Sequence, residues 1–439
     1  CFQASLLSRV VRTLVVNSGE IAHMSHGDTT KPLIGEEMGD KDLNVYSKGL
    51  GILVEDGLIL SIADSEELIS EYAASWDRNS DKLGDMKIID ANGGAIVPGF
   101  VDSHTHLIWD GDRTNEMALR QRGLTYSDIS KLGGGISKTV ESTRSRSVEE
   151  LVRLGVQRAS NALKLGTTTM EAKSGYGLST ESELKILEAT ERVNKISACE
   201  IQATWLGAHD IPKHIDKEEY IEELIGKQLS MVVQQGIAKW ADVFCEPGWF
   251  TIDDTIEIIT ASKEMGLGSR IHADEFVDSG GLDIAAELGS ISADHVAKSD
   301  DESRAKANDS GVMQTFLPGT QYVLGIDEFP PMKNCVENSW AFSIASDFNP
   351  NCNTISMPFV GSLATHRCGI DPITALAAST RNPSTTMMNN ENVNFGVISE
   401  NNPASFNILH SKKVESWCQS PGMNPISKTI SNGVIVKYK

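Results

Sequence analysis

The chain of 439 residues lacks the features that mark membrane proteins and nucleic-acid-binding proteins. No apolar run approaches the ~20 residues that a membrane-spanning helix needs, so we expect no membrane span. Positive charge is scarce as well, because 39 Lys and Arg residues face 60 Asp and Glu residues and give a net charge of −21. An acidic chain is a poor partner for nucleic acid or for anionic lipid surfaces. The expected partner is therefore a small molecule, and an anionic one would need a local basic group to hold it.

Cysteine is present but lacks the spacing of a metal-binding or disulfide-rich protein. The seven cysteines are odd in number and scattered, and no two form a Cys-x-x-Cys pair: Cys1, Cys199, Cys245, Cys335, Cys352, Cys368 and Cys418. This pattern argues against a thiolate zinc site and against a disulfide framework. It suits a reducing compartment, so we expect a cytoplasmic protein.

Hydrophobic residues make up 40% of the chain, and their first cluster has β character. Two runs, residues 7–18 and 50–63, are rich in Val, Ile and Leu. Glu55-Asp56-Gly57 interrupts the second run and predicts a hairpin turn. Residues 24–48 are polar and predict a long loop. Residues 1–96 are thus expected to form a small, mostly β unit.

A second hairpin is expected just before the chain changes character. Asn92-Gly93-Gly94 lies between two strand-like stretches, residues 88–90 and 95–97, and is typical of a tight turn. The end of the chain returns to β character at residues 395–398, 405–409 and 428–438. We expect this tail to complete the β unit that the first residues begin.

Strand-like and helix-like stretches alternate after residue 97. The candidate strands are residues 99–104, 167–173, 199–206, 241–246, 269–273, 290–295, 311–317 and 341–347. Helix-like stretches lie between them, for example Ser147–Leu165 and Thr180–Asn194. Eight strands that alternate with helices are the signature of a (β/α)8 barrel. We therefore predict an α/β fold, with a barrel at residues 97–392 and a small β-rich domain built from residues 1–96 and 393–439.

Histidines gather at the predicted strand ends, where barrel enzymes carry their chemistry. His104 and His106 are two apart at the end of the first strand, so both imidazoles point to one face. That spacing alone is also typical of two hydrogen-bonded interior histidines. Three further strands end in His209, His272 and His295, so five of the ten histidines occupy strand ends. The pattern as a whole indicates a metal site.

The expected ligands of this site are three imidazoles and one carboxylate: His104, His106, His272 and Asp347. Such a set suits one divalent ion, Zn2+ or Fe2+, and leaves a position for a water molecule whose pKa the metal lowers. Binuclear sites of this type usually use a carboxylated lysine at the end of the fourth strand. This chain has Phe244-Cys245-Glu246 there, which favours a single metal.

Three residues near the predicted metal are candidates for proton transfer and oxyanion binding. Glu275 lies three residues after His272 and is either a proton shuttle or a solvated carboxylate at a helix start. His295 is either a fifth ligand or a hydrogen-bond donor to the developing oxyanion, and we favour the donor. Asp347 is a second candidate to take the proton of a metal-bound water.

Several segments together carry a more specific pattern. They are His104-Thr-His106 with Arg113 and Asn115-Glu116, Gly133-Gly134-Gly135-Ile136, Lys173-Ser-Gly-Tyr-Gly-Leu178, Leu206-Gly-Ala-His209, Asp242-Val-Phe-Cys-Glu246, His272-Ala-Asp-Glu275, Ser292-Ala-Asp-His295, Leu317-Pro-Gly319 and Ser346-Asp-Phe-Asn-Pro350. The set closely resembles the imidazolonepropionase family of the amidohydrolase superfamily, over about residues 50–380. The triple glycine and the Ser-Gly-Tyr-Gly-Leu segment are its most specific parts, because most amidohydrolases lack them.

The resemblance implies an activity and a set of site residues. The family hydrolyses 4-imidazolone-5-propanoate to N-formimidoyl-L-glutamate in histidine degradation, which opens a cyclic amide. By resemblance the metal ligands are His104, His106, His272 and Asp347, and the substrate-binding residues are Arg113, Tyr176, His209 and Glu275, with Asn349 near the product. Arg113 would hold the propanoate group of the substrate through a charge-assisted pair. The family also suggests a homodimer.

One segment departs from the family pattern. Members often carry Asp-x-Asn-Pro-Gly-Thr after the eighth strand, whereas this chain has Asp347-Phe-Asn-Pro-Asn351-Cys352, a form similar to animal versions. The departure leaves the roles of Asn351 and Cys352 open. Two other functions also stay open. One is a different metal-dependent amidohydrolase or deaminase that acts on a carboxylate-bearing cyclic amide or amidine, and the other is an inactive barrel that serves as a binding protein.

Overall fold

Eight parallel strands form the central sheet of the computed structural model, which describes residues 11–387 and 393–437. In chain order they are β9 (Phe100–Asp102), β10 (Thr167–Lys173), β11 (Glu200–Ala208), β12 (Trp240–Cys245), β13 (Gly268–Ala273), β14 (Ser292–His295), β15 (Met313–Phe316) and β16 (Phe342–Ile344). Each strand pairs with the next one along the chain. Each also overlaps the stretch predicted for it, which confirms the barrel.

The ring of strands closes at the level of the predicted site. Thr105 and Phe348, which lie just past β9 and β16, form a parallel bridge. The His106 amide donates to the Phe348 carbonyl at 2.8 Å, and the Asp347 amide donates to the His104 carbonyl at 3.1 Å. Backbone hydrogen bonds therefore fix the first and last strand ends to each other, together with the side chains that these segments carry.

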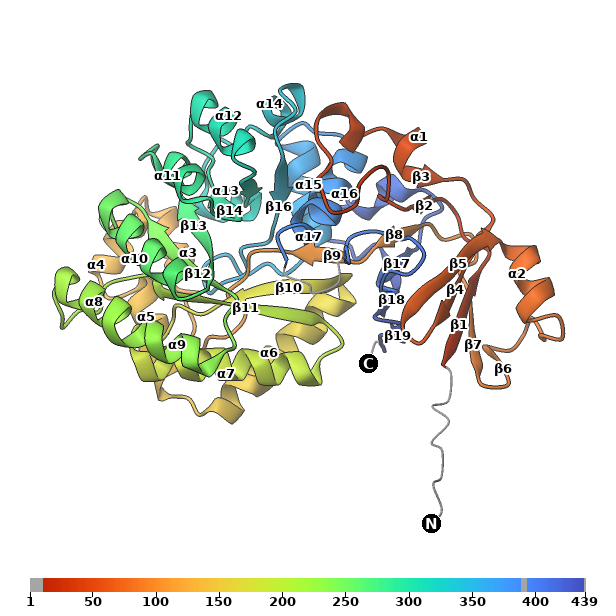
Figure 1. Cartoon of the computed structure of the whole chain (residues 1–439), viewed down its shortest axis with the longest axis horizontal. Helices are drawn as coiled ribbons and strands as arrows, with labels where there is room; N and C mark the ends of the chain where they lie inside the picture. The colour runs from red at the N-terminus through yellow and green to blue at the C-terminus, as the bar shows by residue number, and fades with distance from the viewer. Residues whose placement is uncertain (1–10, 388–392, 438–439) are drawn as a thin grey trace, which may run out of the picture.

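Helices cover the outside of the ring (Figure 1). The segment after β9 carries α3 (Glu116–Gln121), α4 (Tyr126–Lys131) and α5 (Gly135–Ser145). The later helices are α6 (Val148–Lys164), α7 (Thr180–Ile196), α8 (Lys217–Glu223), α9 (Leu229–Gln235), α10 (Ile252–Glu264), α11 (Gly281–Leu288), α12 (Asp301–Asp309), α13 (Pro318–Leu324), α14 (Met332–Glu337), α15 (Met357–His366), α16 (Pro372–Ser379) and α17 (Arg381–Ser384). A π-helical segment, Leu224–Gln228, joins α8 to α9.

Helix α6 illustrates how the sequence allows close packing on the ring. The helix begins with a capping box, in which the Ser147 hydroxyl accepts the Glu150 amide and the Glu150 carboxylate accepts the Ser147 amide. A Cβ at Gly155 would lie 2.5 Å from Ile108 Cδ1 and 2.7 Å from Val193 Cγ2. Glycine therefore lets α6 approach both α7 and the loop that follows β9.

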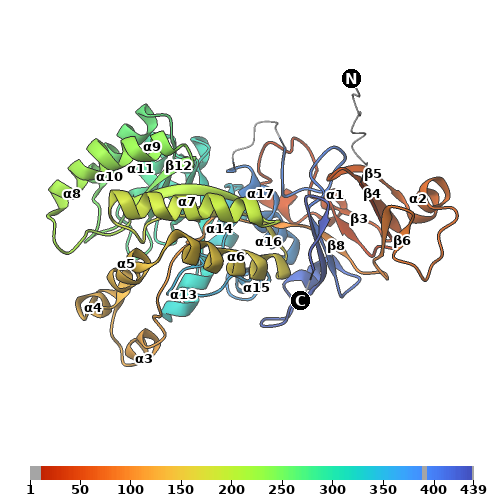
Figure 2. The same cartoon turned by 90° about the horizontal axis from the view of Figure 1, so that it is seen from below.

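Two smaller sheets lie beside the barrel (Figures 1 and 2). One contains β5 (Leu58–Asp64), β4 (Leu50–Glu55), β1 (Arg12–Val16), β7 (Met86–Asp90) and β6 (Lys82–Leu83), with α2 (Ser65–Tyr72) packed against it. The other contains β19 (Val434–Ile435), β18 (Ile426–Ser431), β17 (Phe406–Leu409), β8 (Ile96–Pro98), β2 (Ile21–Ala22) and β3 (Val45–Tyr46). Because β17 pairs with β8, late residues complete a sheet that early residues begin, as predicted.

The hairpin predicted between residues 88–90 and 95–97 is wrong. The turn itself forms, because Asn92 and Gly93 have φ angles of 50° and 76°. The strands on its two sides, β7 and β8, belong to different sheets, so the turn carries the chain from one sheet to the other. An Asn-Gly signal reports a local reversal of the chain, but it does not determine which strands pair.

The other local β predictions had mixed outcomes. The turn at Asp56-Gly57 is a true hairpin, with φ angles of 49° and 85° between the antiparallel strands β4 and β5. Residues 395–398 are buried for the most part but form no strand. The predicted loop at residues 24–48 contains a 3-10 helix (Gly35–Met38), the short helix α1 (Lys41–Asn44) and β3.

Candidate active site

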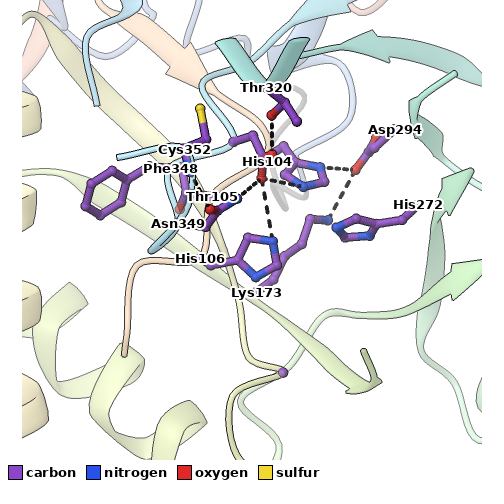
Figure 3. A network of polar contacts seen from close by, with 12 residues as sticks. His104, Thr105, His106, Lys173, His272, Asp294, Thr320, Phe348, Asn349 and Cys352 are labelled. Atoms are coloured by element: carbon purple, nitrogen blue, oxygen red, sulfur yellow. Dashed lines mark hydrogen bonds and ion pairs between the residues drawn. The ribbon is translucent and has the colours of Figure 1, made fainter. Parts of the chain in front are cut away.

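Three histidines and an aspartate converge at the carboxyl ends of the strands (Figure 3). One ring nitrogen from each of His104, His106 and His272 lies within 4.8 Å of the others, and the same holds for ligand atoms of His104, His295 and Asp347. Asp347 Oδ1 is 3.6 Å from His104 Nε2 and 3.8 Å from His106 Nε2. All five side chains are buried.

The hydrogen bonding of these rings fits a metal centre. His104 Nδ1 lies 2.7 Å from Asp294 Oδ2, and His272 Nδ1 lies 3.0 Å from Asp242 Oδ2. The His104 contact is a hydrogen bond, whereas the His272 contact lies outside hydrogen-bond geometry. Within the described residues, Nε2 of both rings is buried and has no hydrogen-bond partner. Buried ring nitrogens normally find a partner. Two such nitrogens beside a carboxylate therefore form a donor set that a divalent cation would satisfy.

Burial favours the neutral form of four histidines at the site. It lowers the pKa of His104, His106 and His295 well below the ordinary value, and neighbouring histidines and Lys173 lower it further. Burial likewise lowers the pKa of His209 to about 3. Neutral imidazole is the form that binds metal ions, so these rings need not lose a proton first.

Asp347 is held in a strained but well-anchored position. Its φ of 51° lies in the left-handed region, which few non-glycine residues adopt. Asn349 Nδ2 donates to Asp347 Oδ1 at 2.8 Å, and the Thr320 hydroxyl donates to Oδ2. Burial raises the pKa of Asp347 to about 6, despite these two hydrogen bonds.

A pocket opens above the histidine cluster. Its lining residues are His106, Arg113, Ile136, Tyr176, His209, Phe244, His272, Glu275, Phe276, His295, Thr320, Asp347, Asn349 and Asn351. Nine of the ten predicted site residues are among them, and the tenth, His104, lies in the cluster against His106 and His272. The structure thus brings all the predicted site residues together.

Arg113 reaches the pocket with its guanidinium fixed by a neighbour. Its Nε and Nη2 donate to Glu116 Oε2 at 3.0 and 2.8 Å, and both residues are buried. Glu116 Oε1 in turn accepts the Gly135 amide at 2.9 Å. A Cβ at Gly134 would lie 2.9 Å from Glu116 Oε1, so the triple glycine makes room for this carboxylate.

The turn that carries Tyr176 is held by one buried carboxylate. Glu183 accepts the backbone amides of Gly175, Gly177 and Leu178 at 2.6 to 2.8 Å. A Cβ at Gly177 would lie 2.6 Å from the Glu183 amide nitrogen. The spacing of the Ser-Gly-Tyr-Gly-Leu segment therefore reflects close packing around Glu183, which places the buried Tyr176 side chain in the pocket wall.

Glu275 and His295 lie side by side in the pocket. His295 Nε2 is 3.6 Å from Glu275 Oε2, and the Glu275 amide donates to Glu246 Oε1. Burial raises the pKa of Glu275 well above its ordinary value, and the charges of Asp347 and Glu246 raise it further. Burial and the two neighbouring carboxylates therefore favour the protonated form of Glu275 relative to an exposed glutamate.

The sequence reasoning missed a group of charges beneath the histidines. Glu171, Lys173, Asp242 and Asp294 are buried and in mutual contact. The sequence did indicate this group, because charged residues lie inside predicted strands. A charge that is buried in a strand needs a partner of opposite charge. Asp294, directly before His295, was the clearest instance.

Comparisons with known proteins agree on the family and on the fold. A model described as "Amidohydrolase family" matches residues 87–173. The imidazolonepropionase of Symbiobacterium thermophilum is 39% identical over 378 residues, which is 85% of each chain. That of Geobacillus kaustophilus is 38% identical and covers 81% of this chain and 82% of its own, and that of Haloarcula marismortui is 32% identical and covers 92% and 93%.

Solved structures at low identity share the architecture alone. A triazine hydrolase variant superposes with a TM-score of 0.70 at 12% identity and covers 97% of this chain and 94% of its own. The 5-methylcytosine deaminase of Klebsiella pneumoniae has a TM-score of 0.69 at 15% identity, with 97% of each chain covered. Among the helices that the structure describes, none is long and apolar enough to cross a membrane.

Proposed function

Because the chain belongs to the imidazolonepropionase family of amidohydrolases, we propose that it hydrolyses 4-imidazolone-5-propanoate to N-formimidoyl-L-glutamate, a step of histidine degradation. The observation that carries the proposal is one geometry: a His/Asp cluster with unpartnered ring nitrogens lies in a pocket whose wall holds a buried arginine. The cluster suits hydrolysis, and the arginine suits a substrate with a carboxylate.

The proposed metal ligands are His104, His106, His272 and Asp347. The family and the donor set support a divalent cation, and we propose Zn2+ or Fe2+, because imidazole with one carboxylate suits both ions. When bound, such an ion lowers the pKa of a coordinated water towards neutrality and so supplies hydroxide. His104 and His272 would offer Nε2, since Nδ1 of each ring faces a carboxylate.

Glu275 and His295 are the proposed proton-transfer and oxyanion residues. Glu275, whose pKa is raised by burial, would donate a proton to the leaving ring nitrogen, while Asp347 is the proposed acceptor of the proton from the attacking water. His295, neutral and in the pocket wall, would donate a hydrogen bond to the oxygen of the ring carbonyl as negative charge develops there.

Arg113, Tyr176, His209, Glu275 and Asn349 are the proposed substrate-binding residues. Arg113 is held by Glu116, so its guanidinium group is already oriented when a carboxylate enters. The proposed division into a barrel (97–392) and a composite β domain (1–96 with 393–439) is supported by the pairing of β17 with β8. A homodimeric state and a cytoplasmic location stay predictions.

The decisive experiment follows the ultraviolet absorbance of imidazolone propanoate and measures ammonia at the same time. Ring opening by this enzyme should remove the absorbance without releasing ammonia, whereas a deaminase would release it. A chelator should abolish the activity, and Zn2+ or Fe2+ should restore it. Unchanged absorbance with metal-loaded protein would refute the proposed substrate, and full activity of the metal-free protein would refute the metal.

A further inference from the structure

We propose that Lys173 is a positioning residue that organises the metal centre from below. Its ammonium group holds two aspartates, and each aspartate holds one of the histidines that present a nitrogen to the metal. The inference rests on the metal centre proposed above, and it assigns a task to a residue that contacts neither the substrate pocket nor the cluster of unpartnered nitrogens.

The ammonium group of Lys173 is surrounded by three carboxylates. Its Nζ lies 2.7 Å from Asp242 Oδ2, 3.0 Å from Glu171 Oε1 and 3.2 Å from Asp294 Oδ2. All four side chains have no exposed surface. A buried ammonium is stable only with such compensation, and the carboxylates need the ammonium equally. Removing the ammonium group would therefore leave three buried carboxylates without their counter-charge.

The oxygen atoms that contact Lys173 are the ones that contact the histidines. Asp294 Oδ2 lies 2.7 Å from His104 Nδ1 (Figure 3). Asp242 Oδ2 lies 3.0 Å from His272 Nδ1. A carboxylate oxygen only accepts hydrogen bonds, so it favours the tautomer with the proton on Nδ1. Nε2 of both rings is then left as a lone-pair donor, and within the described residues it has no hydrogen-bond partner. Asp294 acts on His104 through a hydrogen bond, whereas Asp242 acts on His272 through a 3.0 Å contact that lies outside hydrogen-bond geometry.

Lys173 also connects three neighbouring parts of the barrel. It ends β10, its side chain reaches Asp242 on β12 and Asp294 on β14, and its amide donates to the Thr105 carbonyl at 2.8 Å. Thr105 lies between the two histidines that follow β9. The side chain of Lys173 therefore links β12 and β14, and its backbone amide links the same residue to the loop after β9.

Glu171 offers a matched control, because it contacts Lys173 but no predicted ligand side chain. The experiment compares Lys173→Met, Glu171→Gln and the double variant. The first measurement is the affinity of the metal-free protein for Zn2+, determined by chelator competition. The second is the visible absorption spectrum of the Co2+-loaded protein. We expect Lys173→Met to weaken Zn2+ binding about 10–100-fold and to change the Co2+ spectrum, while Glu171→Gln stays within about threefold of the parent.

The double variant separates geometry from charge, because its net charge equals that of the parent. Positioning by Lys173 requires the double variant to bind Zn2+ as weakly as Lys173→Met, and recovery of parental affinity would overturn it. Parental affinity in Lys173→Met would overturn it as well. If Lys173→Met does not fold, Lys173→Arg keeps the charge and alters the geometry, and the same loss of affinity is required. Failure of the parent protein to bind any divalent metal would instead refute the proposed metal centre.

Discussion

The proposed carboxylate-binding end of the pocket depends on a pair of residues three apart in the sequence. Arg113 enters the pocket with two of its nitrogens already bound to Glu116. The ion pair with Glu116 lowers the net positive charge that an incoming carboxylate meets. It also orders the long Arg113 side chain in advance, so binding does not include the entropy loss of ordering that side chain. Recognition of a carboxylate by Arg113 would therefore rely more on the fixed N–H donors of the guanidinium than on long-range electrostatic attraction.

We expect Arg113→Ala to raise KM for imidazolone propanoate about 10–100-fold, with a smaller effect on kcat. The change removes a charge-assisted contact of about 1.5–3 kcal/mol to a part of the substrate that does not react. Arg113→Lys keeps the charge without the fork and should give an intermediate KM in steady-state assays. An unchanged KM in Arg113→Ala would show that another group holds the propanoate.

Glu275 should destabilise the metal-free protein as the pH rises. Its folded-state pKa is raised, so the folded state binds more protons than the unfolded state at any pH between the unfolded value, about 4.3, and the folded one. Stability then falls with pH across that window. Glu275→Gln mimics the neutral acid, so its stability advantage over the parent should grow as the pH rises above about 4.3, in urea unfolding of metal-free protein. An advantage independent of pH would contradict the raised pKa.

At the scale of elements, helix packing and loop position are coupled through α6. Gly155 lets α6 approach Ile108, which lies in the same loop as His106. The side-chain volume on this helix face thus affects the position of a predicted metal ligand, although the helix lies outside the barrel.

Gly155→Ala should reduce the free energy of unfolding by about 1–3 kcal/mol, because the added methyl group overlaps Ile108 and Val193. Gly226 is a suitable control. It is also helical, and an added Cβ there meets no atom within 4 Å. Gly226→Ala should be neutral or stabilising by up to about 1 kcal/mol. Equal effects of the two substitutions in chemical unfolding would contradict the packing explanation.

The elements also show what the sequence could and could not predict. The barrel strands were predictable because each is a short apolar run between helices, and the histidines were predictable because they end such runs. The partner of β8 was not predictable, because Asn92-Gly93 fixes a turn while β17 lies far along the chain. The roles of Lys173 and Asp242 were hidden for the same reason: a buried charge inside a strand indicates that a partner exists, but only the fold shows which one.

At the scale of the whole molecule, the C-terminal segment joins the small sheets to the barrel. Trp417 is fully buried, its ring centroid lies 5.1 Å from that of Phe100, and its indole N–H donates to the Pro372 carbonyl at 2.9 Å. A Cβ at Gly361 would lie 2.2 Å from the Trp417 ring, so α15 has a glycine where the indole packs.

Trp417→Ala should lower the free energy of unfolding by about 3–5 kcal/mol, because it leaves a large cavity between the C-terminal segment and the barrel. Met423→Ala is the control, since Met423 is 70% exposed and its truncation should change stability by less than about 0.5 kcal/mol. Thermal unfolding of both variants checks this. A Trp417→Ala protein as stable as the control would show that the segment contributes little to the barrel.

The pairing of β8 with β17 has a consequence for the order in which the protein is made. Asn407 on β17 hydrogen-bonds to Pro98 on β8, 309 residues earlier in the chain. At about 5–20 residues per second, a ribosome needs roughly 15 to 60 seconds to synthesise the segment between them. During that interval the nascent chain presents an open strand edge on β8, which invites wrong pairing with other chains. The small sheet can therefore be completed only after the barrel has been synthesised.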